Sequence, residues 1–202
     1  MTTAAPIFIF DIGGVLIRHD NDLLYDRLAA CCADPAAARV ALGLGRHDRD
    51  IGSGRLGIEG LHALLVDELG FEADYPKFLE LWSSHFSEEP GMEPLVRALA
   101  DRYRVVLFSN TNAAHLAHIR ENYPVLSHAH AGYMSHELGL VKPDADSFRQ
   151  VLSLEGCRAE DGIFIDDRAD NTAAAASLGI RTVTFTGCES FLMRLASWGL
   201  AV

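Results

Sequence analysis

A short apolar run near the start of the chain, Ile7–Phe10, ends in an aspartate and is followed by two glycines. The run is too short for a stable helix and is typical of a strand buried on both faces of a parallel sheet. Gly13 and Gly14 permit a sharp turn and the close approach of a ligand. Asp11 therefore marks the carboxyl end of a central strand, where open α/β sheets bind their ligands. A carboxylate in this place suggests a nucleophile or a metal ligand.

Further apolar runs predict the other strands, and from the second run onward helical segments separate them: Arg104–Ser109, His128–Tyr133, Gly162–Ile165 and Arg181–Phe185. Strands that alternate with helices are typical of βαβ units. We therefore predict an α/β protein with a Rossmann-like parallel sheet.

The stretch between the first two runs is about ninety residues long, far more than an ordinary crossover needs. Asp34 followed by proline is typical of a helix start. Apolar residues at helical spacing follow in two stripes: Leu61, Leu64, Leu65 and Leu69, ending at Gly70, and then Phe78, Leu79, Trp82 and Phe86. We predict an α/β core formed by residues 1–16 and 90–202, and a helical cap, residues 17–89, inserted directly after the first strand.

Acidic residues outnumber basic ones, with 28 Asp and Glu against 17 Lys and Arg, which gives a net charge of −11. Without a basic tract, neither nucleic acid nor an anionic membrane is an expected partner. No window reaches the roughly 18 apolar residues of a membrane span, and the N-terminus lacks the basic segment of a signal peptide. We expect a cytoplasmic monomer or homodimer whose cysteines, without zinc or redox spacing, stay reduced: Cys31, Cys32, Cys157 and Cys188.

Polar residues follow the ends of the predicted strands. Asp11 ends the first, Ser109 the second, and Asp166 and Asp167 the fourth, while Lys142 follows the third. Because the carboxyl ends of parallel strands share one edge of the sheet, these side chains are expected in a single pocket.

This set of residues has a specific chemistry. Three neighbouring carboxylates repel one another unless a cation holds them, and Mg²⁺ accepts carboxylates together with water and substrate phosphate. Ser109 and Asn110 lie where a helix is expected to begin, so they can hold an anion. Lys142 suits a phosphate and favours the ionised form of Asp11. A carboxylate beside a bound phosphate can attack phosphorus.

The four motifs, in this order, resemble those of the haloacid dehalogenase-like (HAD) hydrolase superfamily: Phe-Asp-Ile-Gly-Gly-Val-Leu, Ser-Asn-Thr-Asn, Glu-Leu-Gly-Leu-Val-Lys-Pro and Phe-Ile-Asp-Asp-Arg-Ala-Asp-Asn. The likeness extends over the whole chain. It is greatest to small bacterial sugar-phosphate phosphatases of the α-D-glucose-1-phosphate phosphatase type, and the phosphatase domain of soluble epoxide hydrolase is a further relative.

The resemblance implies a magnesium site and a covalent intermediate. Asp11 would be the nucleophile, form a phosphoaspartyl intermediate and bind Mg²⁺, with the backbone carbonyl of Gly13 as another ligand. Asp167 would be a direct carboxylate ligand, and Asp166 either a ligand or the residue that orients water and Lys142.

The resemblance also implies how phosphate is bound. Ser109 and Asn110 would hold the transferring phosphoryl group, and Lys142 would bridge the nucleophile and the phosphate. The implied partner is a small phosphorylated metabolite.

Gly13 departs from the family pattern, because many family phosphatases carry a general acid/base aspartate two residues after the nucleophile. Such help is worth about 10²–10⁴-fold in rate. Three interpretations remain open: a sugar 1-phosphate leaves through a more acidic anomeric oxygen, or Asp20, Asp22 or a metal-bound water serves instead, or the protein mainly binds its ligand.

The sequence thus predicts a Mg²⁺-dependent phosphatase for a small phosphomonoester, such as a sugar 1-phosphate. The alternatives are a 2-haloacid dehalogenase, a phosphoglucomutase-type transferase and a non-catalytic sugar-phosphate-binding protein. His115 and His118 have a helical spacing that permits a metal site, but without an evident third ligand we expect a solvated helix face there.

Overall fold

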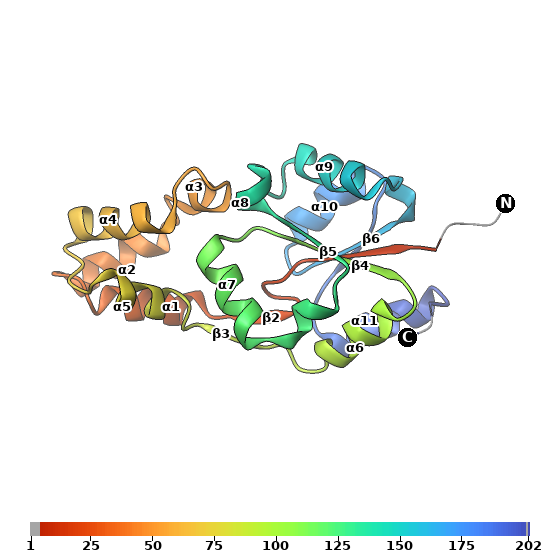
Figure 1. The fold of residues 1–202 in the computed structure, drawn as a ribbon, viewed down its shortest axis with the longest axis horizontal. Helices are drawn as coiled ribbons and strands as arrows, with labels where there is room; N and C mark the ends of the chain where they lie inside the picture. Colours follow the sequence, from red (N-terminus) through yellow and green to blue (C-terminus); the bar gives the residue numbers. More distant parts are fainter. Residues whose placement is uncertain (1–4, 201) are drawn as a thin grey trace.

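The computed structural model describes residues 5–200 and 202. Its centre is a five-stranded sheet with the order β5-β4-β1-β6-β7 (Figure 1), in which every neighbouring pair is parallel. The strands are β1 (Ile7–Phe10), β4 (Arg104–Ser109), β5 (Ala131–Met134), β6 (Gly162–Asp166) and β7 (Arg181–Thr184). The predicted α/β class is confirmed, and Asp11 follows the central strand.

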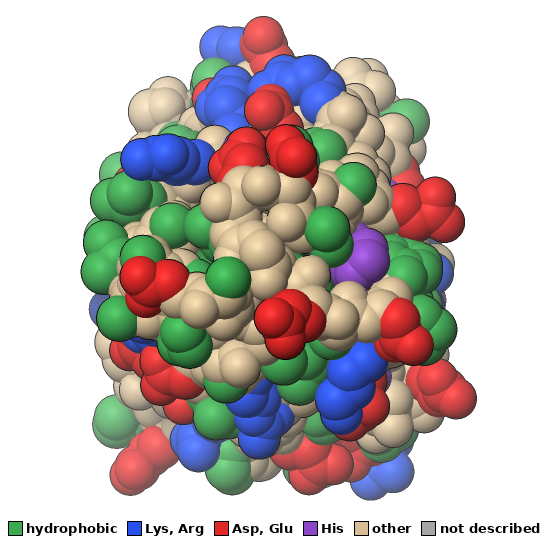
Figure 2. All heavy atoms as spheres, turned by 90° about the vertical axis from the view of Figure 1, so that its left-hand side faces the viewer, with side chains coloured by type: hydrophobic (Ala, Val, Ile, Leu, Met, Phe, Trp, Pro, Cys, Tyr) green, Lys and Arg blue, Asp and Glu red, His purple; other side chains and the backbone are tan. Residues whose placement is uncertain are grey.

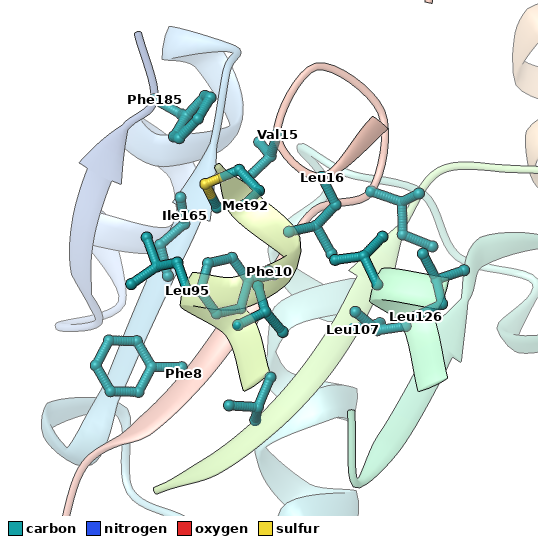
Figure 3. Close-up of a cluster of buried hydrophobic side chains, with 14 of the residues drawn as sticks. Phe8, Phe10, Val15, Leu16, Met92, Leu95, Leu107, Leu126, Ile165 and Phe185 are labelled. Atoms are coloured by element: carbon teal, nitrogen blue, oxygen red, sulfur yellow. The ribbon is translucent and has the colours of Figure 1, made fainter. Parts of the chain in front are cut away.

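Helices cover both faces of this sheet. They are α6 (Met92–Ala100), α7 (Ala113–Asn122), α9 (Ala145–Glu155), α10 (Ala169–Ser177) and α11 (Cys188–Ser197), with the shorter η1 (Pro124–His128), α8 (Ser135–Leu138) and η2 (Ala159–Asp161) between them. Side chains alternate across a strand, so Phe8 and Phe10 join the cluster that contains Met92 and Leu95 of α6 (Figure 3). Residues of α11 belong to the same cluster, whereas Ile9 joins the cluster with α9 and α10. Burial on both faces explains the unbroken apolar run.

A helical segment lies to one side of the sheet (Figure 1) and has its own apolar core. It contains α1 (Asn21–Ala29), α2 (Pro35–Gly43), α3 (Asp48–Gly52), α4 (Ile58–Leu69) and α5 (Tyr75–Trp82). The chain enters this segment through β2 (Ile17–His19) and leaves it through β3 (Phe86–Glu88), and these two strands pair antiparallel. A two-stranded ribbon therefore connects the helical segment with the sheet.

Helix boundaries in this segment follow local rules. The Asp34 side chain accepts a hydrogen bond from the Ala37 N–H at 3.1 Å and caps α2, and Gly70 ends α4 in the left-handed region with φ 61°, as their residue types favour. The predicted helical stripe from Phe78 to Phe86 is too long. Helix α5 ends at Trp82, and Phe86 begins β3.

The predicted strand 128–133 is displaced in the structure. Residues up to His128 form the short helix η1, which begins at Pro124, and β5 starts only at Ala131. Proline suits the first position of a helical turn, and the Ser127 hydroxyl donates to the Pro124 carbonyl at 2.7 Å. Local turn chemistry therefore overrides the apolar pattern at the start of this run.

Acidic and basic side chains are interspersed on the outer face of the helical segment (Figure 2) rather than sorted by sign. The cysteines are free thiols: Cys31, Cys32, Cys157 and Cys188. Within residues 5–200 and 202, no helix combines the length and apolar composition that crossing a bilayer requires.

Candidate active site

Side chains from distant parts of the chain meet at the carboxyl edge of the sheet. Asp11 follows β1, Ser109 ends β4, Lys142 follows α8, and Asp167 follows β6; all four line one pocket. Asp166, the last residue of β6, lies beneath them and is fully buried. The structure thus brings together the residues that the sequence placed at separate strand ends.

Lys142 is buried between two carboxylates. Its Nζ lies 2.9 Å from Asp11 Oδ2 and 2.7 Å from Asp166 Oδ2, and it donates to the Phe108 carbonyl at 2.9 Å. The Phe108 and Phe164 rings flank the ammonium, with centroids 5.2 and 5.3 Å away. All three ammonium protons therefore have acceptors, and the side chain is fixed in one position.

Hydrogen bonds and an ion pair fix the orientation of the Asp11 carboxylate. Its Oδ1 accepts the Ile12 N–H at 2.7 Å, and Lys142 and the Ser109 hydroxyl also contact it. Burial raises the pKa of Asp11 to about 7, which Lys142 opposes and the neighbouring Asp166 reinforces. Burial therefore opposes the ionisation of Asp11, and further positive charge at this site would favour it.

The neighbouring carboxylates can bind a cation, which would add positive charge beside Asp11. Oxygens of Asp11, Asp166 and Asp167 lie within 4.8 Å of one another. When all three are ionised, the single ammonium of Lys142 leaves two negative charges unbalanced. Carboxylate oxygens are the donors that Mg²⁺ and other hard divalent cations prefer, so the residues present fit such an ion.

The two consecutive aspartates have different surroundings. Both oxygens of Asp166 accept from the Asn171 amide at 3.0 Å, Oδ2 accepts from Lys142, and Oδ1 accepts the Arg168 N–H at 2.9 Å. Asp167 is far more exposed than Asp166, and partial desolvation of its carboxyl group together with the charge of Asp166 raises its pKa. Asp166 is therefore engaged by the protein itself, whereas Asp167 faces the pocket.

Ser109 and Asn110 do not cap the following helix, although a helix start was expected there. Helix α7 begins at Ala113, and Asn112 caps it by accepting the His115 N–H at 3.0 Å. The Asn110 amide instead forms a reciprocal pair with the Lys142 backbone, donating to its carbonyl at 2.8 Å and accepting its N–H at 2.9 Å. Asn110 thereby ties the second motif to the third.

Aromatic and imidazole side chains line the far side of the pocket, including Tyr25, Trp82, His85 and His115. The expectation of a solvated face is wrong for His115, which stacks on Trp82 with centroids 4.8 Å apart and is hydrogen-bonded to the Trp82 carbonyl at 3.0 Å. Burial lowers the pKa of His115 to about 3 and that of His85 to about 4. Both rings are therefore neutral at physiological pH.

The acidic candidates for the missing proton donor are engaged elsewhere. Asp20 caps α1 by accepting the Leu23 N–H at 2.9 Å, and Asp22 pairs with Arg39. Both line an adjoining pocket rather than the one around Asp11, whereas His19 lines both pockets. Sequence reasoning missed His19, because nothing local to its strand indicates that its ring turns toward the catalytic loops.

The structure thus combines a parallel α/β sheet, an inserted helical segment and a carboxylate–lysine cluster at the carboxyl edge of the sheet. A family model of the haloacid dehalogenase-like hydrolases matches residues 6–179, and the chain belongs to this family. The resemblance inferred from the four motifs is confirmed, and with it the assignment of the protein as a phosphatase-like hydrolase.

Among characterised relatives, D-ribitol-5-phosphate phosphatase of Bacteroides thetaiotaomicron is 24% identical over 86% of this chain and 88% of its own length. The chloroplast flavin mononucleotide hydrolase 1 of Arabidopsis thaliana is 27% identical over 66% of this chain and 54% of its own length. A crystal structure of a family enzyme from B. thetaiotaomicron, in complex with magnesium and inorganic phosphate, matches with a TM-score of 0.85 and 24% identity. That match covers 95% of this chain and 100% of that chain.

Proposed function

We propose that this protein is a Mg²⁺-dependent phosphomonoesterase for a small sugar or polyol phosphate, with Asp11 as the nucleophile. The observation that carries the proposal is the buried ammonium of Lys142, held 2.9 Å from Asp11 and 2.7 Å from Asp166 beside a cation-binding set of carboxylates. One cluster thus supplies a positioned nucleophile and positive charge for a phosphate.

The metal site is assigned to Asp11, the Gly13 carbonyl and Asp167. Asp166 belongs to the same cluster, but its oxygens are already hydrogen-bonded, so we assign it to hold Lys142 in place. When bound, Mg²⁺ supplies positive charge that neutralises phosphate oxygens and favours the ionised form of Asp11. The magnesium and phosphate in the crystal structure of the B. thetaiotaomicron enzyme support this assignment.

The covalent step follows from the way Asp11 is held. The Ile12 N–H and Lys142 fix the carboxylate, which attacks phosphorus as the bond to the leaving oxygen breaks. The Ser109 hydroxyl and the Asn110 main-chain N–H would hold the phosphoryl oxygens, and the positive charge of Lys142 would balance part of their negative charge. Water then attacks the phosphoaspartyl group, releasing inorganic phosphate and restoring Asp11.

The helical segment, residues 17–89, is assigned as a cap that closes the pocket over the substrate. Residues of this segment and of the sheet line the pocket together, and Arg49 of α3 pairs with Asp144 at 2.6 Å beside the Lys142 loop. Closing excludes bulk water and strengthens the electrostatic interactions around the phosphate. The mixed polar and aromatic lining fits a small hydroxylated leaving group, and the ribitol-5-phosphate relative supports this substrate class.

A phosphate-release assay with a panel of sugar and polyol phosphates, with and without Mg²⁺, tests the proposal. The wild type should release phosphate only with Mg²⁺, and Asp11→Asn should abolish release and prevent trapping of a phosphorylated protein by mass spectrometry. Asp146→Asn is the matched control, because Asp146 is an exposed carboxylate paired with Arg149 on α9. Turnover that survives in Asp11→Asn, or that ignores EDTA, would contradict covalent metal-dependent catalysis.

A further inference from the structure

The imidazole ring of His19 lies next to Gly13. A Cβ built on Gly13 would lie 3.8 Å from both Cδ2 and Nε2 of His19. Gly13 and His19 line the same pocket as Asp11 and Lys142. The His19 ring therefore lies beside the nucleophile loop at Gly13, a position that has no side chain of its own.

The backbone of His19 is fixed while its ring is free. His19 ends β2 and is in register with Phe86 of β3, and the following residue, Asp20, caps α1. Within the described part of the chain, the His19 ring makes no hydrogen bond, and the residue is exposed to the pocket. Its polar ring atoms are therefore available to a bound ligand.

Several other proton-carrying groups near the pocket are already hydrogen-bonded, paired or buried. Lys142 donates to three protein oxygens, Asp20 caps a helix, and Asp22 is paired with Arg39. His85 and His115 have pKa values of about 4 and 3, because they are buried.

We propose that His19 is a catalytic residue that passes a proton to the leaving oxygen of the phosphomonoester. This inference rests on the proposed function. As the Asp11 carboxylate attacks phosphorus, the bond between phosphorus and the leaving oxygen breaks and its electron pair stays on that oxygen. The imidazolium Nε2 gives its proton to this oxygen, so the product leaves as an alcohol and the ring becomes neutral. The neutral ring then takes a proton from the water that attacks the phosphoaspartyl group, which restores the imidazolium.

His19 extends the substrate class beyond esters with acidic leaving groups. Primary and secondary alcohols are poor leaving groups without a proton, and a positioned donor accelerates their departure by about 10²–10⁴-fold. The chain can therefore hydrolyse phosphate esters of sugar or polyol hydroxyl groups, in addition to the sugar 1-phosphates that leave through an anomeric oxygen.

Comparing two leaving groups tests this role. Ribitol 5-phosphate requires protonation of its leaving alcohol, whereas the nitrophenolate of p-nitrophenyl phosphate leaves without it. We expect His19→Gln to lower kcat/KM for ribitol 5-phosphate by about 10²–10⁴-fold and for the aryl ester by less than about tenfold. His128→Gln is the control, because His128 pairs with Glu93 and does not line the pocket. Equal losses for both esters, or no loss for either, would overturn the proposal.

A second variant tests whether a proton donor at this spot is sufficient. Gly13 is outside the left-handed region, and a Cβ there meets only the His19 ring. Gly13→Asp combined with His19→Ala should therefore recover at least about tenfold of the ribitol 5-phosphate activity lost in His19→Ala. The absence of recovery would count against proton transfer at this position.

The outcomes separate the two proposals. A wild type that releases phosphate from neither ester contradicts the proposed function and the His19 role together. Activity in the wild type that Asp11→Asn abolishes, with His19→Gln equal to wild type on both esters, overturns only the role of His19.

Discussion

The carboxylate of Asp167 occupies the space that a side chain at Gly14 would need. A Cβ on Gly14 would lie 2.4 Å from Asp167 Oδ2 and 2.5 Å from Asp167 Cγ, and Gly14 has φ 72°. The loop after β1 and the loop after β6 therefore interlock through a glycine and a proposed metal ligand. The absence of a side chain at Gly14 sets the position of that carboxylate.

Replacing Gly14 should displace Asp167. We expect Gly14→Ala to weaken Mg²⁺ binding and lower kcat by about 10-fold or more, because metal ligands must keep their geometry. The left-handed backbone adds about 1–2 kcal/mol of instability. Mg²⁺ titration of activity, followed by thermal melting, measures both effects.

Gly156→Ala is a control that introduces the strain of a left-handed backbone without displacing Asp167. Gly156 ends α9 with φ 62°, and a Cβ there meets nothing within 4 Å. This variant should lose similar stability and keep its Mg²⁺ dependence. Equal Mg²⁺ affinity in the Gly14 and Gly156 variants would contradict the interlock.

Lys142→Met should destabilise the protein strongly, because it leaves Asp11 and Asp166 buried without their counter-charge. Removing one partner from a buried ion pair costs about 3–5 kcal/mol, and activity should be lost with it. Lys77 is the other lysine of the chain and pairs with Glu80 on the surface. Lys77→Met should change the free energy of unfolding by less than about 0.5 kcal/mol. Chemical denaturation of both variants tests the contrast, which similar losses would refute.

Much of the sheet edge could be predicted from the sequence, because strand ends are local features and parallel strands share one edge. The apolar runs before Asp11, Ser109 and Asp166 are nearly continuous, so their directions and ends follow from the pattern. The position of Lys142 after the third predicted strand placed it at the same edge. The contacts of Lys142 in the structure agree with that expectation.

The far wall of the pocket could not be predicted in the same way. His115 and Trp82 are separated by 33 residues, and their stacking depends on how the helical segment lies against α7. The helical period of His115 and His118 describes one helix alone and cannot show which face another element covers. His19 is similar, since its relation to Gly13 depends on the β2–β3 ribbon.

Trp82→Ala should weaken the contact between the helical segment and α7. Trp82 is 8% exposed, stacks on Phe78 and His115, and donates to Asn112 Oδ1 at 3.5 Å. Truncating a buried tryptophan costs about 3–5 kcal/mol, which corresponds to a loss of roughly 6–20 °C in Tm for a domain of this size. Calorimetry measures the loss.

The control for that change is the other tryptophan of the chain. Trp198 follows α11 and lies under the guanidinium groups of Arg181 and Arg194, with its ring centroid 5.0 and 5.8 Å away. Trp198→Ala should lower the Tm less and leave the KM for substrate unchanged, since Trp198 does not line the pocket. A larger Tm loss for Trp198→Ala would show that the Trp82 contacts contribute little.

The raised pKa of Asp11 predicts an unusual dependence of stability on pH. Its pKa is 3.8 in the unfolded reference and about 7 in the folded protein, because of burial. Between these values the folded state binds the proton and the unfolded state does not, so the contribution of Asp11 lowers stability as pH rises. This cost is absent below the lower pKa and complete above pH 7. Mg²⁺ favours the ionised carboxylate, so its stabilising effect should increase with pH through about 7.

Thermal melting between pH 4.5 and 8, with and without Mg²⁺, isolates this contribution when wild type is compared with Asp11→Asn. The amide does not titrate, so metal-free Asp11→Asn should lose less stability than the wild type as pH rises toward 7. Other carboxylates that titrate in this range, Asp167 included, are present in both proteins and cancel to first order in the difference. Mg²⁺ should shift the Tm of the wild type more than that of Asp11→Asn at pH 8, because the variant has lost one charged ligand. Parallel pH profiles for the two proteins would mean that Asp11 is already ionised in the metal-free fold, stabilised by Lys142 without a dication.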